Sequence, residues 1–121
     1  MKLKKVRIQI RPVKDISKEW GRALRGEIKS LQKPGTLVFT SLSAVAKVLS
    51  PVRLEILGAI LKHEPDSISS LAKILGRDFK NVYADVQLLS SVGILELKGH
   101  GKRDAVRPVA LYSGIELNLA A

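Results

Sequence analysis

The chain has 121 residues and no cysteine, which excludes disulfide bonds and thiolate metal sites. Hydrophobic residues make up 45% of the chain and aromatic residues only 4%, so the core must be aliphatic, and one domain is the simplest arrangement at this length. We find neither a signal peptide nor the roughly 20 consecutive apolar residues that a membrane span needs, and we therefore expect a cytoplasmic protein with no membrane partner.

The formal net charge of +10 and the pI near 10.2 point to a polyanionic partner, most often a nucleic acid. Residues 1–60 contain 13 Lys and Arg and 4 acidic residues (net +9), whereas residues 61–121 contain 8 and 7 (net +1). Electrostatic attraction is therefore expected to come mainly from residues 1–33. A basic surface that only keeps the protein in solution is the alternative.

The first 35 residues are predicted to form a basic strand-helix extension. Residues 3–11 alternate between apolar and polar or basic side chains, which is typical of a strand with one solvated face. Beyond Pro12, residues 15–31 have apolar side chains at helical spacing. The opposite side of this helix carries Lys18, Arg22, Arg25 and Lys29. That basic side is a solvated surface, a dimer contact, a contact to the DNA backbone or a surface for a partner protein.

Residues 36–113 are predicted to form one domain, which begins with a strand and two helices. Residues 36–40 are a short β-type run, and residues 42–49 return to helical spacing. Ser50 and Pro51 match an N-cap followed by a first-turn proline, so a second helix is expected to start there. The side chains of this helix that are expected in the core are Leu54, Leu57, Ile60 and Leu61.

Two further helices are predicted on either side of a tight turn at Gly76. The first is capped by Asp66 or Ser67, and the second spans residues 79–92, with Asp78 as its N-cap and Gly93 just beyond its end. The first of these helices is expected to place Ile68, Leu71, Ala72 and Leu75 in the core. Two helices joined by a tight turn follow the helix-turn-helix plan.

The helix over residues 79–92 has two different faces. At about 100° per residue, one side collects Phe79, Val82, Val86 and Leu89, and the opposite side collects Lys80, Ala84, Gln87 and Ser91, with Asn81 on the flank. The first side can enter a core, and the second is expected to remain in solvent. We interpret this helix as a DNA-recognition helix.

A β-hairpin is predicted directly after the recognition helix, in the position of a wing. Its strands are residues 94–97 and 106–112, and Pro108 favours an edge position for the second strand. Residues 114–121 are predicted to form a last strand that could pair with the N-terminal strand. The expected fold class is α/β of the α+β type, a winged helix-turn-helix with a C-terminal β-hairpin wing and an N-terminal strand-helix extension.

Residues 71–82 read Leu-Ala-x-x-Leu-Gly-Arg-Asp-x-Lys-Asn-Val, between Pro51–Leu57 on one side and Leu88–Leu95 on the other. Over about residues 36–113, the chain resembles the MarR-like winged-helix predicted transcriptional regulators of archaea and bacteria. This resemblance implies sequence-specific binding to double-stranded DNA, usually as a homodimer and without a cofactor. Several members of that family act as antitoxins beside a small toxin.

The residues expected to reach base edges are Lys80, Asn81, Ala84 and Gln87. A lysine can donate to guanine, and asparagine or glutamine can pair with adenine. The residues expected at phosphates are Arg77 and Tyr83, and those expected in the wing are Lys98, His100, Lys102, Arg103 and Arg107. These surfaces could instead be solvated or contact proteins, since winged helices also serve that purpose.

Enzymatic chemistry is not indicated by the sequence. There is no Gly-rich phosphate loop, no His pair at ligand spacing and no carboxylate pair in an apolar context, so we expect no catalysis, no metal and no cofactor. Asp78 and Asp85 are expected to cap a helix or to orient neighbouring Arg or Lys side chains. The predicted function is a sequence-specific DNA-binding transcriptional regulator. The alternatives are an antitoxin that binds a toxin protein and regulates its own operon, and a nonspecific basic nucleic-acid-binding protein.

Overall fold

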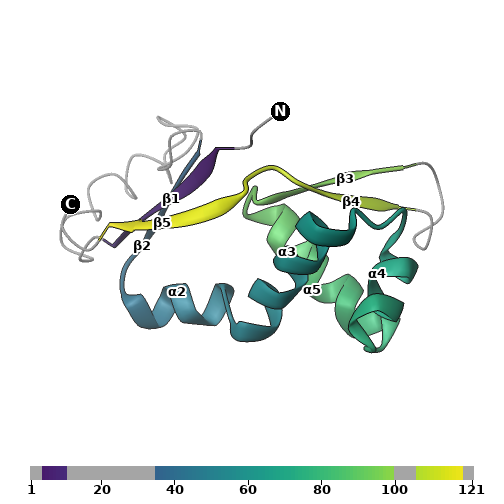
Figure 1. Ribbon diagram of the computed structural model, residues 1–121. Helices are drawn as coiled ribbons and strands as arrows, with labels where there is room; N and C mark the ends of the chain where they lie inside the picture. Colours follow the sequence, from purple (N-terminus) through teal and green to yellow (C-terminus); the bar gives the residue numbers. More distant parts are fainter. Residues whose placement is uncertain (1–3, 11–34, 100–105, 119–121) are drawn as a thin grey trace, which may run out of the picture. The chain divides into compact units, whose positions relative to one another are not determined.

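A computed structural model of the protein describes residues 4–10, 35–99 and 106–118. Within these ranges the chain forms four helices and five strands (Figure 1), an α+β composition. They divide into two compact units, a helical unit of residues 48–113 with the segment 1–4, and a sheet unit of residues 5–47 and 114–121. The helix predicted over residues 15–31 lies outside the described residues, and so do several predicted contact residues: Lys18, Arg22, Arg25, Lys29, His100, Lys102 and Arg103.

The sheet unit contains three strands and one helix: β1 (Lys5–Ile10), β2 (Thr36–Phe39), α2 (Leu42–Val48) and β5 (Gly114–Asn118). The strand order is β2-β1-β5, and β1 runs parallel to both neighbours. Pairing of the last strand with the N-terminal strand is confirmed. Because backbone ladders join β2 to β1, β2 belongs to this unit, although the sequence had assigned it to the domain of residues 36–113.

One apolar row crosses this sheet from strand to strand. Leu37 of β2 and Leu117 of β5 are both register partners of Ile8. Leu37 and Ile8 are buried, while Leu117, on an edge strand, keeps 41% of its surface exposed. The opposite face of β1 presents Lys5 and Arg7 to solvent, as its alternating pattern predicted.

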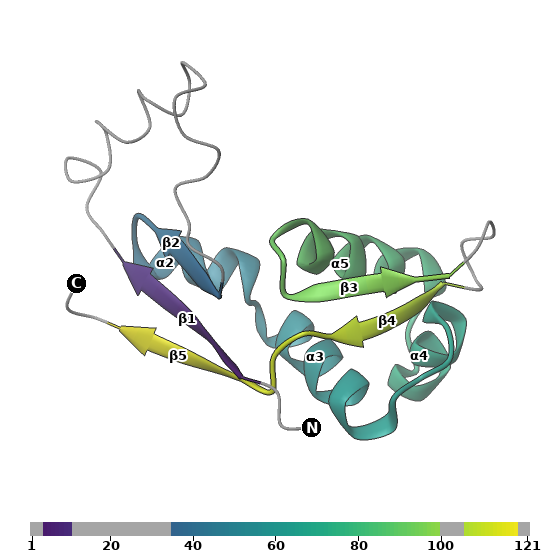
Figure 2. The ribbon, with the colours of Figure 1, turned by 90° about the horizontal axis from the view of Figure 1, so that it is seen from above.

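The helical unit contains α3 (Pro51–His63), α4 (Ile68–Leu75), α5 (Phe79–Ser91), β3 (Leu95–Lys98) and β4 (Arg107–Ala110). β3 and β4 pair antiparallel, with Leu95 opposite Ala110 and Lys98 opposite Arg107. The hairpin lies along one side of the three helices (Figure 2). The order of three helices followed by a hairpin is the order that the sequence predicted.

The core of the helical unit is aliphatic, and it corrects the predicted inward face of α3. Its members include Ile56, Leu57, Ile60, Ile68, Leu71, Ala72, Val82, Val86, Leu89, Ile94 and Leu95. Leu54 and Leu61, which were expected in this core, are 44% and 39% exposed. The prediction was right for Leu57 and Ile60 and wrong for Leu54 and Leu61. Apolar residues lie nearly all around α3, so their spacing does not single out one face.

Each helix of the helical unit has a residue of a common N-cap type just before its first turn, and two of these residues form a capping hydrogen bond. The Ser50 hydroxyl accepts a hydrogen bond from the Arg53 amide at 3.3 Å, and the Ser67 hydroxyl accepts one from the Ser70 amide at 3.0 Å. Asp78 occupies the N-cap position of α5, as predicted, but its side chain makes no capping hydrogen bond. α4 ends at Gly76 with φ 65°, a left-handed conformation that glycine adopts without strain.

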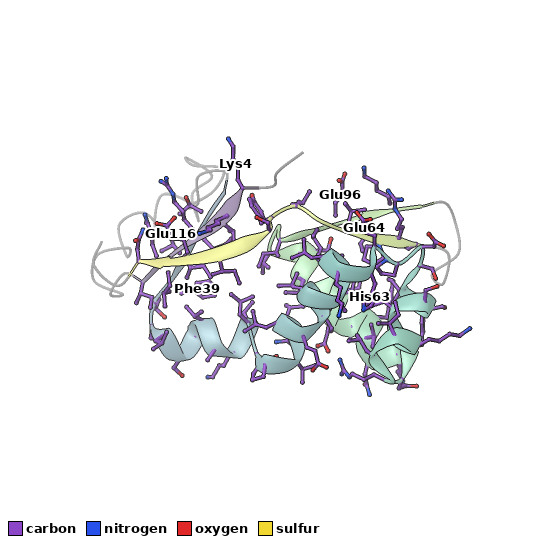
Figure 3. All side chains as sticks on the ribbon, viewed as in Figure 1. Lys4, Phe39, His63, Glu64, Glu96 and Glu116 are labelled. Carbon is purple, nitrogen blue, oxygen red and sulfur yellow. The ribbon has the colours of Figure 1, made fainter. Side chains whose placement is uncertain are left out.

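Glu64 lies at the end of α3 (Figure 3). Its backbone is in the left-handed region, with φ 45° and ψ 58°. Among the described residues it is the only non-glycine residue with positive φ. Its backbone amide still donates to the Ile60 carbonyl at 3.0 Å, which completes the last turn of the helix. A side chain with a Cβ is strained in this conformation by roughly 1–2 kcal/mol.

The N-caps of α4 and α5 can be compared by mutation. Ser67→Ala removes a capping hydrogen bond and is expected to lower the free energy of unfolding by about 1 kcal/mol. Asp78→Ala removes only the attraction of a carboxylate to the helix N-terminus, and we expect a smaller loss, about 0.5 kcal/mol. Urea unfolding of both variants measures the difference. An equal or larger loss for Asp78→Ala would contradict the assignment of the caps.

Glu64→Gly relieves the left-handed strain and is expected to raise the free energy of unfolding by about 0.5–1 kcal/mol, after the greater flexibility of glycine in the unfolded chain is subtracted. Glu64→Ala is the matched control, because it removes the same carboxylate and keeps the Cβ. If thermal or urea unfolding finds that the alanine variant gains as much as the glycine variant, the gain comes from the lost charge and not from φ.

Candidate functional site

The exposed face of α5 is the first part of the candidate site. Val82, Val86 and Leu89 are each 0% exposed, which fixes the rotation of the helix about its axis. The residues that this rotation leaves exposed are Lys80, Asn81, Ala84, Gln87 and Ser91. The predicted division of this helix into a core face and a solvent face is confirmed. Four of the six residues predicted for the recognition helix therefore lie on one accessible surface.

Tyr83 and Gln87 form a local pair at the edge of this surface. The Gln87 amide nitrogen donates to the Tyr83 hydroxyl at 2.8 Å, one helical turn away. The Tyr83 ring stacks on the Phe79 ring, with centroids 5.8 Å apart and an angle of 6° between the planes. Phe79, predicted on the core side, is half-buried. This stack and hydrogen bond direct the Gln87 side chain towards the N-terminal half of α5.

Asp85 links α5 electrostatically to α3 and to the turn that precedes α5. Its Oδ1 accepts from the Nε of Arg53 on α3 at 3.1 Å, and its Oδ2 accepts from both terminal nitrogens of Arg77 at 3.3 Å. Arg77 belongs to the turn between α4 and α5, so one carboxylate contacts α3, the turn and α5. The expectation that Asp85 orients neighbouring arginines is confirmed. Its Arg53 partner lies 32 positions away and has no local sequence signal.

The hairpin contains two of the five residues that were predicted for a wing, Lys98 and Arg107, and the structure describes both. Lys98, the last residue of β3, and Arg107, the first residue of β4, are register partners, and both are exposed. Lys98 lies 3.9 Å from Glu96, a distance at which an exposed ion pair adds little. Figure 3 shows Glu96 on the side of β3 away from the helices. The two cations are thus adjacent and accessible.

A hollow that the sequence did not predict lies between the end of α3 and β4. Its volume is about 430 Å³, and its lining is mixed apolar and charged. The lining residues are Ile60, Leu61, Glu64, Pro65, Arg107, Pro108, Val109 and Ala110.

No group of three or more His, Asp or Glu side chains in the described ranges could hold a metal ion. Nor does that part of the chain contain a helix with the length and apolar content of a membrane span.

The described residues form an α+β fold. In its helical unit, three helices and a hairpin leave one face of α5 exposed, and this face carries the cation Lys80. The chain belongs to the HVO_A0114 family, whose model matches residues 48–117. The match covers the whole helical core and hairpin and continues through most of β5. No curated protein matches the sequence.

Proposed function

We propose that residues 48–113 are a winged helix-turn-helix domain and that the protein is a sequence-specific DNA-binding transcriptional regulator. The observation that carries this proposal is the exposed face of α5. Lys80, Asn81 and Gln87 supply a cation and two amides, side chains that can pair with base edges, and Ala84 leaves room between them. Val82, Val86 and Leu89 on the opposite face are fully buried, so α5 presents these residues on a helix that packing holds in place.

The surrounding elements support the same proposal. α4 and α5 are joined by a short turn at Gly76, and a hairpin with two exposed cations follows α5. This order, the resemblance to MarR-like regulators and the net charge of +10 all favour DNA. If the protein acts as a homodimer, we expect inverted half-sites about one helical turn apart, about 34 Å.

Selection of binding sites from random duplex DNA is the direct test. A recovered consensus would support a specific regulator. Retention of unenriched DNA would support a nonspecific nucleic-acid-binding protein, and no retention at low salt would contradict the proposal.

An antitoxin is the second candidate, and one feature of the sheet unit favours it. Ile115 and Leu117 are 37% and 41% exposed on β5, which is an edge strand among the described residues, so this part of the sheet offers apolar side chains and a strand edge to a partner protein. A small toxin-like gene next to the coding sequence would favour this candidate, and its absence would count against it.

Lys80→Ala and Gln87→Ala are each expected to weaken binding to the selected site by about 1–3 kcal/mol and to weaken binding to random duplexes much less, because base-edge contacts are lost. Lys62→Ala on α3 is the control that removes a charge from another exposed position. Fluorescence anisotropy with both duplexes measures the difference. Equal losses on the selected and random duplexes would rule out base reading by α5.

Joint replacement of Lys98 and Arg107 by alanine should weaken binding to all duplexes alike. The slope of log affinity against log salt should become shallower by up to about 0.9 per lost phosphate contact. Anisotropy titrations over a range of salt concentrations give this slope, again with Lys62→Ala as the control. An unchanged slope would place the hairpin away from DNA.

A further inference from the structure

The cluster of Asp85, Arg53 and Arg77 has an unusual charge balance. One carboxylate, that of Asp85, faces the guanidinium groups of both Arg53 and Arg77. The formal charge of the three side chains is therefore +1. Arg53 also donates from Nη1 to the Val48 carbonyl at 3.2 Å, which further holds its guanidinium in place.

Both arginines are held firmly but remain accessible. The side chains of Arg53, Arg77 and Asp85 are 22%, 30% and 16% exposed. Partial burial lowers the screening of their charges by salt. A guanidinium already fixed by a carboxylate loses less side-chain entropy when it binds a further group. The cluster therefore presents positive charge in a preorganised form.

Arg77 also borders an open hollow beside the turn between α4 and α5. The residues that line this hollow are Ser69, Ala72, Lys73, Gly76, Arg77 and Phe79. They include two cationic residues, one hydroxyl and no carboxylate. The guanidinium, ammonium and hydroxyl groups that these residues carry are of the kinds that bind the oxygens of a phosphate.

We propose that Arg77 and Lys73 bind one phosphodiester of the DNA backbone at this hollow and that Asp85 is a positioning residue for Arg77. Arg53 shares the carboxylate and ties it to α3. This inference rests on the proposed DNA-binding function and deepens it, because it assigns a backbone-binding site outside the base-reading face of α5. It also predicts that a negatively charged residue, Asp85, strengthens the binding of a polyanion.

Asp85→Asn separates positioning from simple electrostatics. Loss of a negative charge alone should tighten binding to DNA, whereas loss of the carboxylate that holds Arg77 should weaken it. We expect binding of the full-length variant to random-sequence duplex to be weaker by about fivefold or more. Glu55→Gln, which removes an exposed carboxylate from α3, is the matched control and should leave affinity unchanged or slightly tighter.

A double-mutant cycle with Arg77→Ala completes the test. Arg77→Ala should make the salt slope shallower by about 0.9, and Asp85→Asn should have no further weakening effect in the Arg77→Ala background. Anisotropy titrations at several salt concentrations give the affinities, and stoichiometric titration gives the active fraction of each variant. If Asp85→Asn does not fold, the slope of Arg77→Ala decides the proposal alone.

The outcomes separate the two proposals. Any one of three results would overturn this inference and leave the proposed function standing. The first is a folded Asp85→Asn variant that binds as tightly as the wild type or more tightly. The others are an unchanged slope for Arg77→Ala and an equal effect of Asp85→Asn with and without Arg77. A wild-type protein that binds no duplex at low salt would overturn the proposed function and this inference together.

Discussion

Burial of one side of α5 is the constraint on which the candidate site depends. Val82, Val86 and Leu89 are fully buried, and each contributes about 1.5–3 kcal/mol relative to an exposed side chain. A rotation of the helix by one residue, about 100°, would expose these side chains and bring Lys80 or Asn81 towards the core. The same packing that stabilises the helical unit therefore determines which residues face outwards.

Asp85 adds a directional interaction to this non-directional packing. It lies on the flank of α5, between the buried and exposed faces, where a carboxylate can reach cations on both α3 and the turn at Arg77. Hydrogen bonds to two charged partners restrict both rotation and sliding of α5 against α3. Because the side chain is only 16% exposed, this cluster is less screened than the exposed pair of Lys98 and Glu96.

In the sheet unit, pairing between strands positions the elements. β1 lies between two parallel neighbours, and its Val6 and Ile8 are buried while Lys5 and Arg7 remain exposed. β5 ends the matched region of the HVO_A0114 family and forms one edge of this sheet. The family match therefore includes β5 but not residues 5–9 of β1, the strand segment with which β5 pairs.

Local signals in the sequence predicted the helices, their caps and the faces of α5. Ser50, Ser67 and Gly76 act through hydrogen bonds and dihedral angles within one or two turns, and the apolar spacing of Val82, Val86 and Leu89 is a property of a single helix. Such features can be read from neighbouring residues. The position of Asp78 could be predicted in the same way, although its side chain does not form the expected bond.

Only the tertiary structure decided three features of the protein. These are the inward face of α3, the neighbours of β1 and the partners of Asp85. α3 is apolar on several sides, so contact with α4 and α5, and not its own pattern, selects Ile56 and Ile60 over Leu54 and Leu61. Arg53 and Asp85 meet across 32 positions, and β1 and β5 pair across most of the chain. Residues so far apart contact one another only when packing brings their elements together, and no local periodicity encodes that choice.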